Sequence, residues 1–486
     1  MSSRLNIIPT SESHLNPHPG EIGEQTEFAG NVALVTLGCA KNLVDSEVML
    51  GALVHRGFHP VVDAENADLI VVNTCAFLQS AVEESVDRIL ELARYKSTGR
   101  CRKLVVAGCL VERYRGDLIE SLPEVDHFLT TDELLKAGAA GTLDAKALTA
   151  ASRPYFLYDE NSPRVRSTGR HSAYVKIAEG CGRPCSFCII PKLRGNFRSR
   201  ETSSVESEIR ELLEQGVREI NFVAQDLTAY GNDLRSDEAC NLTQLLRRVE
   251  PLKLEYGLFW IRLLYAYPVG VTRELIDTIA ESKVVCKYLD LPLQHISASV
   301  LKGMQRPLGA KRTRELIENI RNWAPQIALR STFIVGFPGE SDQDIAQLEA
   351  FVAEGHFTHV GVFCYSQEEE AKSFHFDEQV PPELSAERRE RIMTAQHAVV
   401  QKRMCELKGL LTPALLEGDH SESNLLLSAR TQWQAPETDG EVIVNEIADE
   451  LLEAEDFDRA ELSGRFVDIE ITGHLEYDLL AKVTGL

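Results

Sequence analysis

Residues 179–188 read EGCGRPCSFC, and this stretch decides both the fold and the chemistry of the chain. Cys181, Cys185 and Cys188 are separated by three residues and then by two. Four thiolates normally close an iron-sulfur site or a structural zinc site, so a compact group of three leaves one metal position without a protein ligand. Such an open position indicates that a reactant binds there.

Two other interpretations of the three cysteines stay open at this point. They could belong to a zinc knuckle whose fourth ligand lies far away in the sequence, or they could be unrelated thiols. No CxxC pair follows at the spacing of a zinc ribbon. Eleven cysteines in a chain without a signal peptide or a long apolar span indicate a reducing compartment, so we interpret them as ligands and not as disulfides. The predicted location is cytoplasmic.

A second group of cysteines follows the predicted strands of residues 30–145. Cys39, Cys75 and Cys109 each stand just after an apolar run typical of a strand buried on both faces. The carboxyl ends of parallel strands meet at one edge of a sheet, where such folds place their ligand site. We therefore predict a doubly wound parallel sheet with a second three-thiolate site, although buried cysteine is also common as a small core residue. The three runs are Val32–Leu37, Leu69–Val72 and Leu104–Ala107.

One helix of this first domain is predicted from its periodicity. Apolar residues recur at three-to-four spacing between residues 77 and 93, which predicts one buried stripe. Its members are Phe77, Leu78, Ala81, Val82, Val86, Ile89, Leu90 and Ala93.

Residues 167–401 alternate again between strand and helix patterns, which predicts a partial (β/α)6 barrel. The motif of Cys181, Cys185 and Cys188 follows the first predicted strand, at the carboxyl-terminal mouth where such barrels place their chemistry. The six strand runs are Tyr174–Ile177, Glu219–Val223, Leu258–Leu264, Tyr288–Leu291, Leu329–Val335 and His359–Phe363.

The chain resembles the methylthiotransferases among the radical S-adenosylmethionine (SAM) enzymes from about residue 30 to its end. The matching segments are LGCAKNLVDSE, NTCAF, AGCL, EGCGRPCSFCIIPKLRGNFRSR, FVAQD, LDLPLQHIS and FIVGFPGE. The resemblance implies two [4Fe-4S] clusters, one on Cys39, Cys75 and Cys109 and one on Cys181, Cys185 and Cys188. It implies that the second cluster binds SAM and cleaves it to a 5′-deoxyadenosyl radical, and that the first holds the sulfur that is methylated and transferred.

The resemblance also places SAM contacts after the later strands of the barrel. They are Gln225, Asp226, Gln294, His295, Ser331, Gly336 and Gly339. Taken singly, Gly-Phe-Pro-Gly before a helix is an ordinary turn, and a lone histidine is more often a core residue. Basic residues also cluster after the cysteine motif, either as a solvated face or as a rim for an anionic group. They are Arg183, Lys192, Arg194, Arg198 and Arg200. The remaining cysteines, Cys101, Cys240, Cys286, Cys364 and Cys405, are interpreted as packing residues.

Residues 402–486 resemble the small all-β TRAM domain of the family, which binds substrate. Phosphate binding requires Lys and Arg, yet Thr412–Leu486 holds four basic residues against 18 acidic ones. A surface of this sign repels RNA and attracts a basic protein. Within the family, it favours the branch that methylthiolates the β-carbon of an aspartate in the basic ribosomal protein S-twelve. Nucleic acid is then an improbable substrate, and the resemblance implies an electron donor such as flavodoxin or ferredoxin.

Three further segments are described by composition alone. Residues 1–29 are predicted to be a disordered tail, residues 146–166 a linker, and residues 445–463 an acidic insertion in the terminal domain. The insertion is either a solvated helix with no role or an extension of the acidic face.

Two alternative functions remain open beside the protein methylthiotransferase. One is a transfer RNA methylthiotransferase that acts on a modified adenosine, against which the acidic terminal domain argues. The other is a non-catalytic iron-sulfur carrier or scaffold, which would need neither a barrel of this size nor an open iron at each site.

Overall fold

The computed structural model describes residues 29–133, 157–235, 240–453 and 458–486. The chain forms two compact units, and each of them contains several separate segments. Unit 1 holds residues up to Thr168 together with Ala178–Gly182 and Ile189–Arg200. Unit 2 holds Gly169–Ile177, Arg183–Cys188 and Glu201–Leu486. The predicted tail (residues 1–29) lies outside the described residues except for residue 29. Residues 146–156 of the predicted linker (146–166) also lie outside them.

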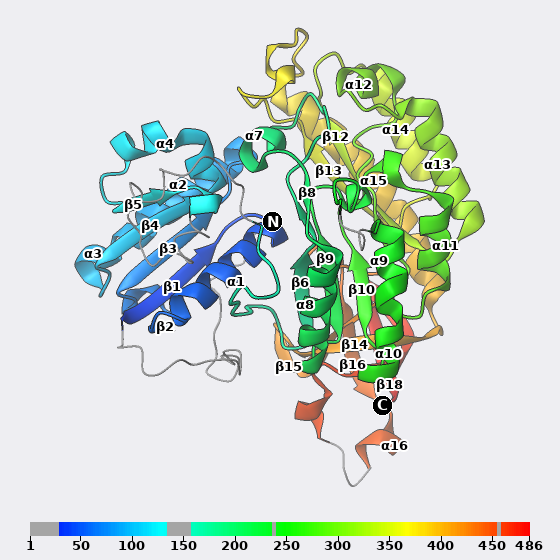
Figure 1. The fold of residues 1–486 in the computed structure, drawn as a ribbon. Helices are drawn as coiled ribbons and strands as arrows, with labels where there is room; N and C mark the ends of the chain where they lie inside the picture. The colour runs from blue at the N-terminus through cyan, green and yellow to red at the C-terminus, as the bar shows by residue number, and fades with distance from the viewer. Residues whose placement is uncertain (1–28, 134–156, 236–239, 454–457) are drawn as a thin grey trace. The chain divides into compact units, whose positions relative to one another are not determined.

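Unit 1 contains a five-stranded parallel sheet in the order β2-β1-β3-β4-β5, drawn from blue to cyan in Figure 1. This is a doubly wound order whose direction reverses between β1 and β3, so the prediction for this domain is confirmed. The short edge strands β2 and β5 were not predicted. The strands are β1 (Gly30–Thr36), β2 (Phe58–Pro60), β3 (Leu69–Thr74), β4 (Lys103–Gly108) and β5 (His127–Leu129).

The central strands of this sheet are apolar and buried, as sequences covered on both faces must be. The main helices beside the sheet are α1 (Ala40–Val54), α2 (Gln79–Ala93) and α4 (Cys109–Ser121). A short helix, α3 (Tyr95–Thr98), follows α2. The predicted stripe on α2 is partly wrong, because Leu90 is exposed while Ser85, Ile89 and Leu92 are buried. The buried face is therefore narrower than the sequence pattern suggested.

Unit 2 contains six parallel strands that follow one another in chain order, as predicted. They form two three-stranded sheets, β10-β9-β6 and β11-β12-β13, and a parallel bridge from Ile261 to Val285 joins β10 to the segment before β11. The strands are β6 (Ser172–Lys176), β9 (Glu219–Val223), β10 (Trp260–Leu263), β11 (Tyr288–Asp290), β12 (Ala328–Val335) and β13 (His359–Cys364).

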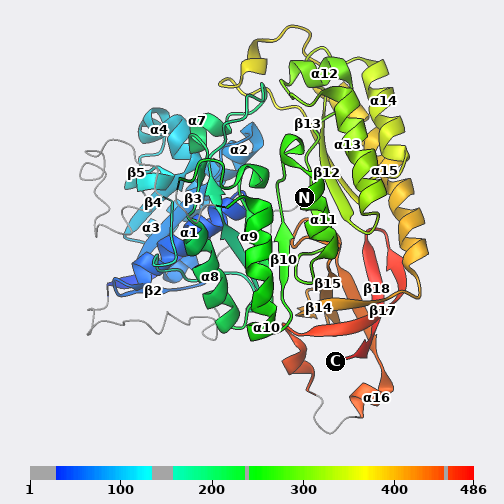
Figure 2. The ribbon, with the colours of Figure 1, turned by 45° about the vertical axis from the view of Figure 1, so that its right-hand side comes forward.

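Helices flank these strands in Figure 2, as a partial (β/α) barrel requires. The longest, α15, leads from the barrel to the terminal domain. The helices are α8 (Thr202–Glu214), α9 (Leu242–Val249), α10 (Lys253–Tyr256), α11 (Arg273–Glu281), α12 (Ala298–Gly303), α13 (Gly309–Trp323), α14 (Asp342–Ala353) and α15 (Pro382–Leu407).

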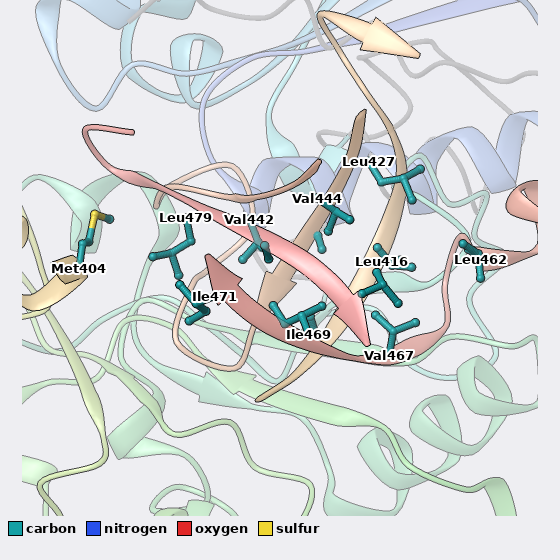
Figure 3. Packing of buried hydrophobic residues seen from close by; sticks show 14 of the residues in the cluster. Met404, Leu416, Leu427, Val442, Val444, Leu462, Val467, Ile469, Ile471 and Leu479 are labelled. Atoms are coloured by element: carbon teal, nitrogen blue, oxygen red, sulfur yellow. The ribbon is translucent and has the colours of Figure 1, made fainter. Parts of the chain in front are cut away.

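The terminal domain is a closed barrel in the order β14-β15-β16-β18-β17, which confirms the predicted small all-β fold. Figure 3 shows its interior, where Val467, Ile469 and Ile471 alternate inward from β17 as their spacing predicted. The strands are β14 (Leu411–His420), β15 (Ser423–Thr431), β16 (Val442–Ile447), β17 (Phe466–Leu475) and β18 (Asp478–Gly485). The predicted insertion contains one short helix, α16 (Asp449–Leu452), and residues 454–457 lie outside the described residues.

A buried charge network joins the terminal barrel to the strands of unit 2. Glu219, the first residue of β9, accepts hydrogen bonds from Arg262 on β10 and Arg430 on β15, and the side chains of all three are almost entirely buried. Burial would raise the pKa of the Glu219 carboxyl, but the two guanidinium groups hold it well below its ordinary value.

A second network lies at the amino-terminal ends of the neighbouring strands. Asp439, from the loop between β15 and β16, accepts from the Tyr288 hydroxyl at 2.7 Å and lies 3.3 Å from the Arg330 guanidinium. Tyr288 begins β11, and Arg330 lies near the start of β12. Both networks therefore fasten the terminal barrel at the end of the strands opposite the mouth that follows their carboxyl ends. Figure 2 shows the same arrangement, with the orange and red barrel at the end of the strands away from α12.

Candidate functional site

Three cysteines of unit 1 lie at the carboxyl ends of adjacent strands, as predicted. Cys39 is the N-cap of α1 after β1, Cys75 directly follows β3, and Cys109 is the first residue of α4 after β4. The first two flank the point where the strand order reverses, which is where doubly wound sheets bind ligands.

Glycines let the cysteine loops approach one another. Gly38 has a φ of +96°, and a Cβ there would lie 2.7 Å from the Cβ of Cys75 and 3.0 Å from its Sγ. Gly108 has a φ of +97°, and a Cβ there would lie 2.4 Å from the Asn73 side-chain oxygen. The loop that carries Cys39 thus passes directly against Cys75, and larger residues at either glycine would be strained and would force the loops apart.

The thiols of this group influence one another electrostatically. Burial, together with the neighbouring Cys109 and Cys39, raises the pKa of the Cys75 thiol to about 12. Burial also raises the pKa of Cys109, while Arg194 acts in the opposite direction. Such thiols keep their protons in the absence of a metal, because unpaired thiolates would be buried together. A metal group that binds here must therefore displace protons from buried thiols.

No group of three or more His, Cys, Asp or Glu side chains within the described ranges is arranged to hold a single metal ion. A cubane cluster is larger than an ion and spreads its cysteine ligands further apart. The thiols of Cys39, Cys75 and Cys109 are soft sulfur donors, and soft sulfur is the ligand that iron-sulfur clusters use. The glycine turns beside them leave no side chain in the way.

Arg194, from the segment after the cysteine motif, is part of unit 1 and is buried there. Its guanidinium lies 2.8 Å from Asp45 and 3.4 Å from Glu179, donates to Asn42, and interacts electrostatically with the Cys109 thiol. Arg200 is also buried, with its guanidinium over the ring of Tyr158. The interpretation of the basic run as a solvated face is therefore wrong for both arginines.

Within unit 2, the part of the motif that carries Cys185 and Cys188 is held from both sides. Ser186 donates to the carbonyl oxygen of Gly303 at 2.7 Å, and its own amide donates to that of Met304. Phe187 packs against the cluster of Val300, Met304 and Phe337. Phe337 belongs to the Gly-Phe-Pro-Gly turn, so that turn supports the cysteine loop by packing.

Two arginines and a tyrosine stand beside Cys185. Arg306 donates to the Cys185 Sγ at 3.6 Å, and the Tyr267 hydroxyl lies 4.0 Å from the same sulfur. The Tyr267 ring lies between the guanidinium groups of Arg183 and Arg306, at 4.3 and 4.4 Å from its centroid. Burial raises the pKa of Tyr267 to about 12, so the phenol is neutral and can donate a hydrogen bond.

The predicted SAM contacts fall into two groups. Gln225, Asp226, Gln294 and Gly339 lie at or after strand ends, and Asp226 is buried in an ion pair with Arg183 at 2.6 Å. Gln294 has a φ of +74°, and its side-chain oxygen has no hydrogen-bond partner among the described residues. Strain of this kind is often found at binding sites.

The other predicted SAM contacts, Ser331, His295 and Gly336, form hydrogen bonds with other parts of the protein. Ser331 donates to the Leu291 carbonyl oxygen at 3.0 Å. His295 is fully buried, accepts from the amide of Ser297 and faces Glu340 at 3.4 Å. Gly336 donates its amide to the carboxylate of Glu340 at 2.8 Å. These residues join the strand ends to the turn that ends at Glu340.

Sequence reasoning missed Tyr267 and Arg306, which have no recognisable motif and lie more than 80 residues from the cysteine they contact. None of the eleven cysteines, all of which lie among the described residues, forms a disulfide bond, as expected. The interpretation of Cys405 as a packing residue is wrong, because it is exposed, with its sulfur 3.4 Å from His474. No helix in the described part of the chain combines the length and apolar character needed to cross a membrane.

Comparison with known families follows the same division of the chain. Residues 31–130 match the model of the uncharacterized protein family UPF0004, residues 175–352 match the radical SAM superfamily, and residues 409–484 match the TRAM domain. Together with the cysteine motif, these matches define a radical SAM protein with an additional cysteine-bearing domain at one end and a β-barrel at the other.

Curated relatives narrow this class. A protein of Koribacter versatilis named ribosomal protein uS12 methylthiotransferase RimO is 43% identical over 93% of this chain and 96% of its own length. A protein of Syntrophotalea carbinolica with the same name is 44% identical over the same shares. The chain belongs to the RimO family.

A solved structure supports the fold. The radical SAM methyltransferase TsrM of Kitasatospora setae, solved with cobalamin and a [4Fe-4S] cluster, aligns with a TM-score of 0.50 and 17% identity. The alignment covers 69% of this chain and 71% of that one. At this identity the likeness bears on the fold alone.

Proposed function

We propose that the protein is a radical SAM methylthiotransferase that adds a methylthio group to the β-carbon of an aspartate in ribosomal protein uS12. The relatives that share 43 to 44% identity over nearly the whole chain are named ribosomal protein uS12 methylthiotransferases. The observation that carries the proposal is the placement of Cys39, Cys75 and Cys109 at adjacent strand ends, in addition to the radical SAM motif.

The two cysteine groups would hold [4Fe-4S] clusters with different roles. Cys181, Cys185 and Cys188 would hold the cluster that binds and cleaves SAM, and Cys39, Cys75 and Cys109 the one that carries the transferred sulfur. When bound, these groups supply the radical and the sulfur, which side chains cannot provide. The protein contributes the thiolates, excludes water and fixes the distance to the target carbon.

Several groups near Cys185 would orient SAM. Gln294, whose side-chain oxygen lacks a partner within the described residues, is a candidate to accept from the cofactor, and Gln225, Asp226 and Gly339 lie at or after neighbouring strand ends. His295, Ser331 and Gly336 would act indirectly, because Nδ1 of His295, the Ser331 hydroxyl and the Gly336 amide bind other parts of the protein and hold the strand ends in place.

The terminal barrel would attract the basic substrate protein. Its exposed acids include Glu446 on β16 and Asp449, Glu450 and Glu453 in and after α16. Since the barrel is fastened to the amino-terminal ends of the strands, these acids would steer the approach of the substrate and would not contact the target aspartate. A transfer RNA would be repelled by the same surface. The electron donor would be a flavodoxin or ferredoxin, and the location cytoplasmic.

The iron content tests the two-cluster proposal. Anaerobically reconstituted protein is expected to hold about eight iron atoms, four for each cubane. Replacement of Cys181, Cys185 and Cys188 by Ala is expected to reduce the iron content to about half, because Cys39, Cys75 and Cys109 remain. Iron and acid-labile sulfide assays make the measurement. Zinc in place of iron after anaerobic purification would contradict the proposal.

Charge reversal tests the substrate. Changing Glu446, Asp449, Glu450 and Glu453 to Lys is expected to slow association with uS12 several-fold at low salt, because exposed charges mainly steer encounter. The difference should shrink at physiological salt, where charges more than about 8 Å apart are largely screened. Stopped-flow association rates against salt concentration would measure it.

The controls for this experiment come from the structure. Asp439 is excluded from the charge-reversal set, because its carboxylate is buried against Tyr288 and Arg330 and Lys there would disrupt the fold. Iron content and SAM cleavage without substrate should be unchanged in the variant. Tighter binding of an unmodified transfer RNA than of uS12 by the native enzyme would instead support the transfer RNA alternative.

A further inference from the structure

The environment of Arg194 connects the three cysteine loops of unit 1 with one another. Arg194 ends α7 (Ile190–Arg194) and is fully surrounded within unit 1. Its guanidinium interacts electrostatically with the thiol of Cys109 at the start of α4. It also donates to the side-chain oxygen of Asn42, one turn after Cys39 on α1.

Asn42 extends this connection to the third cysteine. Its amide group donates to the carbonyl oxygens of Leu37 and Thr74, both at 3.0 Å. Leu37 precedes the Gly38–Cys39 turn, and Thr74 directly precedes Cys75. The guanidinium of Arg194 is thus linked through the side chain of Asn42 to the loops of Cys39 and Cys75, and it acts electrostatically on Cys109.

The charges around Arg194 are unusual for a buried site. Two carboxylates face it, Asp45 on α1 and Glu179 on β7 (Ala178–Glu179), and both are almost fully buried. A buried ion pair is costly to break, because the remaining charge is left without compensation. Buried negative charge therefore lies beside Arg194 before any thiolate forms, and thiolates would add to it.

We propose that Arg194 positions the thiolate ligands of the cluster in unit 1 and supplies the positive charge that raises the reduction potential of that cluster. The inference rests on the proposed function, because it requires a cluster on Cys39, Cys75 and Cys109. Reduction adds an electron to an already negative site, and a fixed positive charge in a low-dielectric environment favours that state. Hydrogen bonds to cluster sulfurs and net charge are established determinants of such potentials.

The test is a redox titration followed by electron paramagnetic resonance. The full-length chain carries Ala at Cys181, Cys185 and Cys188, so the cluster in unit 1 is the one observed, and the native holoenzyme is titrated beside it. In this background, Arg194→Gln is expected to lower the ratio of reduced to oxidised cluster about tenfold at a fixed potential, or about 59 mV for one electron. Arg194→Lys keeps the charge and should shift the ratio much less.

A change of opposite sign provides the decisive comparison. Asp45→Asn removes one of the carboxylates that Arg194 faces, so the ratio of reduced to oxidised cluster should rise. If Arg194→Gln binds no iron, its potential cannot be measured, and the potential of Asp45→Asn then tests the proposal. Lys192→Gln, an equal charge change at an exposed position of the same segment, is the matched control and should leave the potential unchanged.

A merely structural role would give a different pattern. Thermal stability and iron content would fall in Arg194→Gln and Arg194→Lys alike, while the potential of the remaining cluster stayed at the native value in both and in Asp45→Asn. That pattern would overturn the inference. If the Cys181, Cys185 and Cys188 variant with native Arg194 holds no iron at all, the proposed cluster in unit 1 fails instead.

Discussion

Replacement of Cys39, Cys75 and Cys109 by Ala is expected to abolish methylthiolation and to leave reductive formation of 5′-deoxyadenosine from SAM intact. The reason is the division of labour proposed for the two cysteine groups. Under this proposal the radical would arise at the cluster on Cys181, Cys185 and Cys188, and the sulfur would be carried by the cluster on Cys39, Cys75 and Cys109. Without a sulfur source, the substrate cannot gain the methylthio group, and this loss should be complete.

Product chromatography of the SAM cleavage reaction and mass spectrometry of uS12 make the two measurements. Replacement of Cys101 by Ala, another buried cysteine of unit 1, is the matched control and should leave both activities unchanged. Loss of 5′-deoxyadenosine in a folded variant that keeps its second cluster would show that the two roles are assigned wrongly.

Replacement of Glu219 by Gln is expected to destabilise unit 2 by about 3–5 kcal/mol, the usual cost of removing one partner from a buried ion pair. Arg262 and Arg430 would be left buried without a carboxylate between them. Urea unfolding followed by tryptophan emission measures the effect, because Trp260 on β10 packs edge-on against Phe466 on β17 at 4.7 Å and reports on this junction.

A matched control uses an exposed pair of the same kind. Glu274 and Arg247 are both about half exposed, and Glu274→Gln should change the free energy of unfolding by less than about 0.5 kcal/mol. The double change of Glu219→Gln with Arg262→Met should recover part of the loss, because it removes the charge of Arg262 that Glu219 had compensated. Equal stability of Glu219→Gln and the native protein would contradict the proposed importance of the network.

The same network predicts a dependence on pH. The pKa of the folded Glu219 carboxyl lies well below its ordinary value. Burial would raise the pKa of the Glu417 carboxyl, but Arg430 and His171 lower it to about 2. A carboxyl whose folded pKa is depressed stabilises the fold above its unfolded value of about 4.3. This contribution should therefore be fully present at neutral pH and be lost as the pH falls from about 4 toward 2.

Local sequence patterns were enough to predict the strands and the cysteine positions. The central strands of unit 1 are largely apolar, and Cys39, Cys75 and Cys109 each follow one of these strands directly or after a short turn. These features depend on residues close together in the chain, so periodicity and spacing can identify them.

Long-range charge pairing could not be predicted in this way. Glu219 is separated from Arg430 by 211 positions, and a glutamate at the start of a strand is ordinarily exposed. Arg194 stands in a basic run typical of a solvated loop, yet its partners Asp45 and Asn42 lie about 150 residues earlier. Burial of such a residue depends on the whole tertiary structure.

The interleaving of the two units around the cysteine motif limits how the protein can be divided. Ala178–Gly182 and Ile189–Arg200 belong to unit 1, while Arg183–Cys188 between them belongs to unit 2. A protein that ends at residue 168 would contain the rest of unit 1 without Glu179 and Arg194. A protein that begins after residue 168 would contain Arg194 without its partner Asp45. Either half produced alone is therefore expected to be less stable than the same unit in the full-length chain.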